Sequence, residues 1–334
     1  MVDHSNMNSF IKKTLLVLGI LVVVCLVIVI ILVVNQDSNP TPFVQPTESA
    51  ESNRVVFLSD SQDPIWVETF FVQENNNIQA KEMIFSEILK LSPSAVFHLG
   101  DLVAFGFWQN EWAPSDSFTS SLKKHNIEFY PILGNHELFF PSQLGLKNFV
   151  QRYPFHSVTG YSVVKEGVGY ILLNSNFNMH TSKEVSQQIR WFKETLLKFD
   201  NDPQINFVIV ATHHSPYTNS KIVGMDEDVQ KYFVPPFINS LKAKVFLSGH
   251  AHAFEHFKVK GKDFLVIGGG GGLQHPLYKG EDEKVKDLYD SVSTKRMFHF
   301  LEIDNFTDSL KFNVMMLNNK FTSFENVYSL TLNK

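Results

Sequence analysis

Nine polar side chains, each shortly after an apolar run, are the residues of this sequence that could do metal chemistry. They are Asp60 and Gln62, Asp101, Asn135 and His136, His213 and His214, and His250 and His252. Carboxylate, amide and imidazole groups suit Fe, Mn or Zn, and a set of this size can hold two cations. Cys25 is the single cysteine, so neither a disulfide nor a thiolate-bound zinc ion can form within the chain.

The apolar runs before these side chains are typical of buried β-strands, because β-branched and aromatic residues dominate them. The runs lie at 55–58, 95–97, 129–133, 170–173, 207–210, 244–247 and 264–267, and further strands are expected at 298–303, 310–317 and 327–332. Strands of an open α/β sheet deliver functional side chains at their carboxyl ends. We therefore expect the nine polar residues to share one rim.

Helical patterns alternate with these strands. Residues 181–184 (TSKE) have the form of a capping box. An apolar stripe follows this box at Val185, Ile189, Phe192 and Leu196. Pro235 and Pro236 can open a second helix, through Phe237 and Leu241, ahead of the strand at 244. The alternation predicts an α/β fold.

Four motifs, in this order, resemble those of the calcineurin-like metallophosphoesterases. They are Gly100-Asp101, the GNHE of 134–137, the HHSPY of 213–217 and the GHAH of 249–252. The resemblance runs from about Val55 to about His299, and the segment 173–175 (LNS) is similar to the acid phosphatase-like branch. It implies two packed mixed β-sheets flanked by helices.

The same resemblance implies a site for two divalent or trivalent metal ions, with Fe, Mn and Zn as the candidates. Water or hydroxide between the two ions would attack a phosphate ester in line. The implied ligands are Asp101 as the bridge, Asp60 and His252 for the first ion, and Asn135, His213 and His250 for the second. His213 is preferred to His214 as the ligand, and His214 would then contact the substrate or support a ligand.

His136 corresponds to the family's histidine that stabilises or protonates the leaving oxygen. Glu137 could hold the other ring nitrogen of His136. Two positions depart from the family pattern: Gln62 stands where many members have histidine, and Ala104 offers no ligand. Gln62 could bind directly, through water or not at all. Without a tyrosine at 104, we expect no tyrosinate-to-iron colour.

The N-terminus differs in composition from the rest of the chain. Residues 14–34 are 21 uncharged, mostly apolar residues, which predicts a transmembrane helix. Lys12 and Lys13 precede them, so residues 1–13 are expected in the cytosol and the rest in the lumen or outside. Residues 35–53 hold three prolines and predict an extended stalk. The metallophosphoesterase domain is predicted at 54–334, with a glycosylation sequon at Asn305.

Overall composition limits the partners. Lys and Arg number 29 and Asp and Glu 34, a net charge of −5, which argues against nucleic acid. The expected substrate is a small-molecule or lipid phosphate ester, monoester or diester. Phe105, Phe107, Trp108 and Trp112 follow Asp101 in a predicted loop, where they either pack beneath it or grip an apolar part of the substrate. The alternative function is a catalytically weakened ectodomain that binds a ligand as a receptor or adhesion module.

Overall fold

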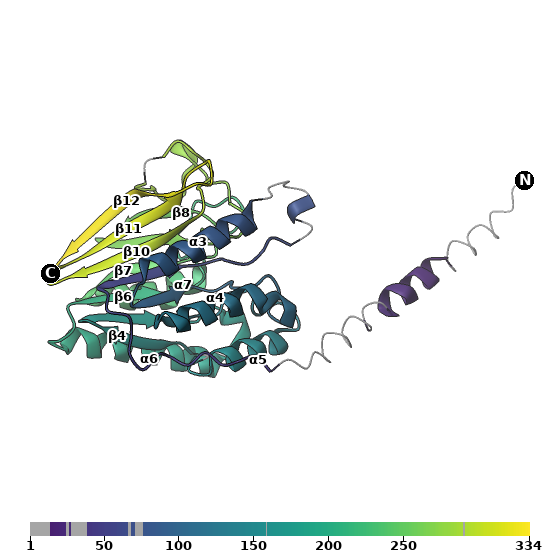
Figure 1. The fold of residues 1–334 in the computed structure, drawn as a ribbon, viewed down its shortest axis with the longest axis horizontal. Coiled ribbons are helices and arrows are strands. Elements are labelled where there is room, and N and C mark those ends of the chain that lie inside the picture. Colours follow the sequence, from purple (N-terminus) through teal and green to yellow (C-terminus); the bar gives the residue numbers. More distant parts are fainter. Residues whose placement is uncertain are drawn as a thin grey trace, which may run out of the picture. The chain divides into compact units, whose positions relative to one another are not determined.

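The computed structural model describes residues 14–24, 27, 39–65, 68–70, 76–157, 159–289 and 291–334. The chain divides into two compact units, residues 1–40 and residues 41–334. In the first unit, residues 14–24 and 27 are helical. The second unit contains the two β-sheets and the helices that cover them (Figure 1).

The predicted transmembrane segment covers residues 14–34. Of these, residues 25, 26 and 28–34 lie outside the described residues. Within the part of the chain that the structure describes, no helix combines the length and the hydropathy needed to cross a bilayer. The transmembrane helix therefore stays a prediction.

The first sheet has six strands in the order β12-β11-β10-β1-β2-β3. Its strands are β1 (Arg54–Leu58), β2 (Ala95–His98), β3 (Glu128–Pro131), β10 (His299–Phe306), β11 (Ser309–Leu317) and β12 (Phe324–Asn333). β1, β2 and β3 run parallel, and β10 pairs antiparallel with β1. The C-terminal strands, yellow in Figure 1, complete the sheet as an antiparallel meander.

The second sheet has six strands in the order β4-β5-β6-β7-β9-β8. Its strands are β4 (Tyr161–Lys165), β5 (Val168–Leu172), β6 (Phe207–Ala211), β7 (Ala243–Ser248), β8 (Phe254–Val259) and β9 (Lys262–Ile267). β5, β6, β7 and β9 are parallel, and the edge strands β4 and β8 are antiparallel to their neighbours. Both sheets are thus mixed, as the sequence predicts.

Helices cover the outer face of each sheet. The helices of the domain are α3 (Asn77–Leu91), α4 (Ala113–Lys124), α5 (Ser142–Arg152), α6 (Ser182–Asn201), α7 (Glu227–Tyr232) and α8 (Val234–Asn239), with short 3₁₀ turns at Gln109–Trp112, Phe177–Met179 and Gly280–Asp282. α3, α4 and α5 pack on the first sheet, and α6, α7 and α8 pack on the second.

The side chains of β1 show why the sheets form the middle of the molecule. Val55 and Phe57 belong to the core between the two sheets, whereas Val56 and Leu58 belong to the core under α3 and α4. A strand buried on both faces is a continuous apolar run, which is the pattern that the sequence shows. The domain is therefore a four-layer arrangement of helices, sheet, sheet and helices.

The predicted strands at 170–173, 207–210 and the other apolar runs all correspond to strands of the structure. The capping box is also confirmed, since the Thr181 side chain accepts from the Glu184 amide and Glu184 returns the bond. The second predicted helix ends earlier than expected, because α8 stops at Asn239 and Leu241 is exposed. Strands β4 and β8 were not predicted.

Residues 41–53 differ from the predicted stalk, because they pack on the domain. Phe43 is buried against the ring of Phe129, with 5.8 Å between centroids, and its amide donates to the Arg152 carbonyl at 2.7 Å. The Gln45 amide exchanges two hydrogen bonds with the backbone of Phe129, at 2.7 and 3.1 Å. This N-terminal segment thus lies along β3.

Candidate metal centre

Both sheets contribute to the same rim of the domain. The loops after β1, β2 and β3 carry Asp60, Gln62, Asp101, Asn135 and His136. The loops after β6 and β7 carry His213, His214, His250 and His252. All nine side chains that the sequence singles out therefore follow the carboxyl ends of parallel strands.

One group of potential ligands consists of Asp60, Asp101 and His252, whose ligand atoms all lie within 4.8 Å of one another. The two aspartates are completely buried, and His252 Nε2 lies 3.4 Å from Asp60 Oδ1. The other ring nitrogen of His252, Nδ1, lies 2.6 Å from the Leu273 carbonyl. A carbonyl accepts, so Nδ1 carries the proton and Nε2 is left for a cation.

Gln62 lies beside this group. Its amide is best satisfied when its nitrogen donates to the carbonyls of Asp60, at 3.3 Å, and Asp101, at 3.0 Å. The amide oxygen then faces His252 Nε2 across 3.3 Å. In this orientation the amide oxygen faces the same space as the ligand atoms of the first group. Direct ligation of a metal ion by Gln62 requires this orientation.

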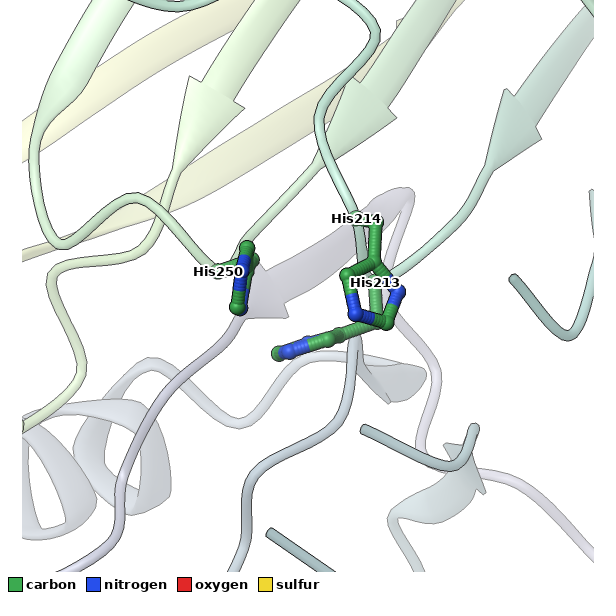
Figure 2. Close-up of side chains that lie close together, drawn as sticks. All are labelled: His213, His214 and His250. Carbon is green, nitrogen blue, oxygen red and sulfur yellow. The ribbon is translucent and has the colours of Figure 1, made fainter. Parts of the chain in front are cut away.

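A second group consists of His213, His214 and His250, again with ligand atoms within 4.8 Å of one another. Figure 2 shows the three imidazoles converging, two from the loop after β6 and one from the loop after β7. His213 Nε2 lies 2.9 Å from Asn135 Oδ1 and 3.3 Å from Asp101 Oδ2. Asp101 therefore stands between the two groups.

The contacts of the two adjacent histidines separate their roles. The His213 ring is fully buried, and its Nδ1 donates to the Leu99 carbonyl at 2.8 Å, which leaves Nε2 facing Asn135 and Asp101. His214 is less buried, and its Nδ1 lies 2.8 Å from the Ser175 hydroxyl. The geometry thus favours His213 over His214 as the ligand next to Asn135.

The loops that carry the ligands have unusual backbone conformations. Asp60, Asp101 and His250 have φ values of 60°, 56° and 64°, in the left-handed region that side chains other than glycine rarely adopt. Such strain persists only where the surrounding structure maintains it, and it concentrates at functional sites. Gly134 permits the close packing of these loops, since a Cβ there would stand 2.1 Å from Asp101 Oδ1.

Opposite charges offset the cost of burying the site. Burial alone would raise the pKa of Asp60, but the hydrogen bond and charge of His252 lower it to about 2. Burial alone would lower the pKa of His213, but the charge of Asp101 raises it to about 9. Burial and the charge of His213 lower the pKa of His250 to about 4, so His250 is neutral near pH 7. A neutral imidazole is the form that binds metal.

His136 and Glu137 have contacts that differ from the expectation. His136 Nδ1 lies 2.9 Å from the Ala104 carbonyl, so Glu137 does not hold that nitrogen. The Glu137 carboxylate is instead fully buried and accepts the backbone amides of Asp101, Leu102 and Gly134 at 2.9, 2.6 and 2.7 Å. It therefore joins the loops after β2 and β3. His136 Nε2 is left free, 3.9 Å from Asp101 Oδ2.

Sequence reasoning missed several supporting groups. Ser175 holds His214 through both its ring and its backbone amide, and only the weaker likeness of the segment 173–175 pointed to it. His275 stacks on His252, with 4.2 Å between centroids, although no motif surrounds it. The carbonyls of Leu99 and Leu273 carry no sequence signal, because every residue has a carbonyl.

The side chains present fit metal ions. Asp60 and Asp101 are buried carboxylates, and among the described residues the ion pairs that each forms are with histidines. Without metal, protonated His213 offsets the charge of Asp101, and a bound cation would take over that role when it displaces the proton. Carboxylate, amide and imidazole donors match the borderline preferences of Fe, Mn and Zn. Two groups, with Asp101 of one lying 3.3 Å from His213 of the other, provide donors for two ions.

Comparison with known proteins identifies the family. A model of the calcineurin-like phosphoesterase domain matches residues 53–254, and the chain belongs to this family. Among solved structures, the fold is similar to that of a purple acid phosphatase from yellow lupin (Lupinus luteus) seeds, with TM-score 0.60 and 15% identity. That match covers 88% of this chain and 55% of the lupin enzyme, so the chain spans about half of that protein.

Two further structures are similar over most of their length. GAP50, described as the anchor in the inner membrane complex of Plasmodium, matches with TM-score 0.59 and 14% identity, over 84% of this chain and 88% of that one. A dimetal phosphatase from Danio rerio matches with TM-score 0.54 and 13% identity, over 84% and 98%. At these identities the likeness shows the fold alone. A search of curated proteins found no match.

Proposed function

We propose that the domain hydrolyses phosphate esters with two bound metal ions. The observation that carries this proposal is the position of Asp101, which belongs to one ligand group with Asp60 and His252 and lies 3.3 Å from His213 of the other. A carboxylate that lies between two ligand groups is suited to bridging two cations. Family membership and the likeness to two phosphatases support the same reaction.

The ligands divide between the two ions according to their contacts. Asp60, Gln62 and His252 would hold the first, Asn135, His213 and His250 would hold the second, and Asp101 could contribute to both. When bound, the two cations lower the pKa of water and neutralise the charge of a phosphoryl group. His214, held by Ser175, faces His250 with 4.6 Å between centroids and is placed to contact a phosphoryl oxygen.

His136 supplies the proton for the leaving oxygen. Because its Nδ1 donates to the Ala104 carbonyl, any transferable proton resides on Nε2, which faces Asp101. The ring is half-buried, so it is within reach of a substrate in the rim. The leaving group of the ester therefore lies on the His136 side of the site.

The test measures hydrolysis of a nitrophenyl phosphate monoester against its diester, with metal-free protein loaded in turn with Mn, Zn and Fe. Turnover of either ester is expected, and the ratio identifies the preferred class. Asp101→Asn should abolish metal loading and turnover together. Asp263→Asn is the matched control, because Asp263 is also buried and bonded to a histidine, His256, outside the site. Full activity of Asp101→Asn would disprove the site assignment.

The alternative, a ligand-binding ectodomain without catalysis, rests on Gln62 and Ala104. The orientation of the Gln62 oxygen toward His252 weakens that argument, since it preserves a donor at this position. The likeness to GAP50 concerns the fold and assigns no anchoring role to this chain. A folded, metal-loaded protein that hydrolyses neither ester would favour the alternative.

We also propose that residues 14–34 anchor the chain in a membrane, with the domain on the non-cytosolic side. The support is the length of this uncharged run and the lysines at 12 and 13. Asn305 is half-buried near the end of β10, where its amide donates to the Glu166 carbonyl at 2.9 Å, and Thr307 is exposed, so the sequon lies at the surface. Glycosidase treatment should shift the mobility of the cellular protein but not of Asn305→Gln. A protein released by alkaline carbonate would contradict the anchor.

A further inference from the structure

Three phenylalanine rings lie next to His136 at the edge of the metal centre. Phe139 meets the His136 ring edge-on, with 4.8 Å between centroids. Phe105 lies 6.1 Å from Phe139 and 5.7 Å from Phe107, so the rings form one continuous series. We call Phe105, Phe107 and Phe139 the aromatic cluster. It begins at the residue assigned to the leaving oxygen and continues from Phe139 to Phe105 and Phe107.

The backbone holds this cluster in a fixed position. The Gly106 amide donates to the His136 carbonyl at 3.1 Å, and a Cβ on Gly106 would stand 2.1 Å from the Glu137 carbonyl oxygen. Asn148 donates to the carbonyls of Gly106 and Phe107 at 2.9 and 3.2 Å. The loops that carry Phe105 and Phe139 are therefore locked together, and a ligand would meet rings that are already ordered.

Core packing covers only part of these rings, since Phe105 and Phe107 are half-buried and Phe139 is exposed. Trp112, from the same loop, is fully buried and donates to the Gly106 carbonyl, so it has the ordinary packing role. Phe139 is 43% exposed, and its chain neighbour Phe140 is 84% exposed. Trp108 is 40% exposed. Apolar side chains that gather at the surface beside a site mark a place for an apolar ligand.

We propose that the aromatic cluster binds an apolar hydrocarbon group attached to the leaving oxygen of the substrate, so that the domain prefers phosphate esters of hydrophobic alcohols. This inference rests on the proposed phosphoesterase function. The occupant follows from continuity: the ester oxygen lies at His136, and the atoms bonded to it extend over the ring that touches His136. The cluster is thus the specificity-determining part of the site.

The experiment compares ethyl phosphate with hexyl phosphate, using the metal-loaded full chain and measuring phosphate release. The two alcohols have nearly the same acidity, so the comparison reports contacts of the hydrocarbon group rather than leaving-group chemistry. Partial burial of four additional methylene groups predicts a kcat/KM about tenfold higher for hexyl phosphate. Phe139→Ala and Phe105→Ala should each reduce this preference severalfold.

Phe306→Ala is the matched control. Phe306 is similarly exposed, but it ends β10 at the opposite end from His299 and far from the rim. This variant should keep the wild-type preference. Circular dichroism of each variant checks folding, and Phe139→Leu, which retains an apolar side chain, should keep most of the preference even if the alanine variant is unstable.

The outcomes separate the cluster from the reaction. Absence of turnover of the alkyl phosphates and of both nitrophenyl esters, with any metal, would count against the proposed function itself. Turnover without a preference for hexyl phosphate, or a preference that Phe139→Ala and Phe105→Ala leave intact, would overturn the aromatic cluster as a substrate site. If the variants keep the wild-type preference for hexyl phosphate but bind phosphatidylcholine vesicles more weakly than the wild-type protein does, the rings contact a membrane surface instead.

Discussion

At the scale of single residues, the site uses one recurrent arrangement of histidine. His136, His213 and His252 each direct Nδ1 to a backbone carbonyl, at 2.9, 2.8 and 2.6 Å. Each ring therefore presents Nε2 to the centre of the site. A carbonyl partner fixes both the tautomer and the ring orientation. In the proposed reaction the same arrangement would serve metal binding at His213 and His252 and proton transfer at His136, since the other surroundings of each Nε2 differ.

His136→Ala should keep both metal ions and slow turnover. The side chain is outside both ligand groups, and the backbone amide of residue 136, which donates to Asp101 at 2.8 Å, remains in the variant. Loss of a general acid lowers turnover by about a hundredfold to ten thousandfold. The loss should be larger for ethyl phosphate than for nitrophenyl phosphate, because the poorer leaving group needs the proton more. Loss of a metal ion, measured by elemental analysis, would instead make His136 a ligand.

Glu137→Gln should weaken metal binding although Glu137 touches no ion. The carboxylate accepts three backbone amides from the loops that carry Asp101 and Asn135, and an amide side chain cannot accept all three. Residues that orient ligands typically change metal affinity by about tenfold to a hundredfold. Asp200→Asn is the control, since Asp200 accepts the amides of Leu241 and Lys242 away from the rim.

Titration calorimetry with Zn or Mn distinguishes these variants. The Asp200 variant should be destabilised but should bind metal within about twofold of wild type, because its contacts lie outside the site. Equal metal affinities of Glu137→Gln and the wild-type protein would show that the loops hold their positions without the carboxylate.

The side chains of the site could be predicted from sequence, but their supports could not. Asp60, Asn135 and His250 have chemistry that few other roles require, and each follows an apolar run. The contact of Glu137 with three amides depends on how two loops fold together, which residue type does not specify. For the same reason the tautomer of His136 came only from the structure.

At the scale of elements, the N-terminal segment 41–50 behaves as an additional layer of the domain. Phe43→Ala should lower the free energy of unfolding by about 3 kcal/mol, because a buried aromatic side chain and its contact with Phe129 are lost. Val44→Ala is the control, since Val44 is exposed and should change stability little. Urea unfolding measures both. Equal stability of the two variants would mean that the segment contributes no packing energy.

The strands that the sequence did not predict are the two edge strands of the second sheet. β4 alternates half-buried and exposed residues and carries a serine and a lysine, and β8 carries Glu255 and His256 within its buried face. Strands in the middle of each sheet are apolar on both faces and give a continuous run, whereas an edge strand does not. The predicted stalk was too long for a related reason. Phe43 and Gln45 are isolated among prolines and polar residues, so no repeating apolar pattern indicated that they pack on the domain.

At the scale of the whole domain, the metal centre connects the two sheets. Asp60, Asp101 and Asn135 come from the first sheet, whereas His213 and His250 come from the second. A shared core also joins the sheets, and at the rim polar contacts such as those of His213 with Asn135 and with Asp101 join them as well. Bound cations would therefore crosslink the layers at this rim.

Metal binding should consequently stabilise the folded domain. Free metal at a hundred times its dissociation constant adds about 2.7 kcal/mol per site, provided that the unfolded chain binds none. A chelator should therefore lower the melting temperature, and Zn or Mn should restore it.

Two variants test this expectation. In Asp101→Asn, the ligand between the two groups is impaired, so most of the difference in melting temperature between metal-loaded and chelated protein should disappear. In Asp263→Asn the difference should persist even though the melting temperature falls, because Asp263 binds His256 outside the rim. Differential scanning calorimetry measures the three proteins in both metal-loaded and chelated states. If chelation leaves the melting temperature of the wild-type protein unchanged, the cations do not connect the two sheets.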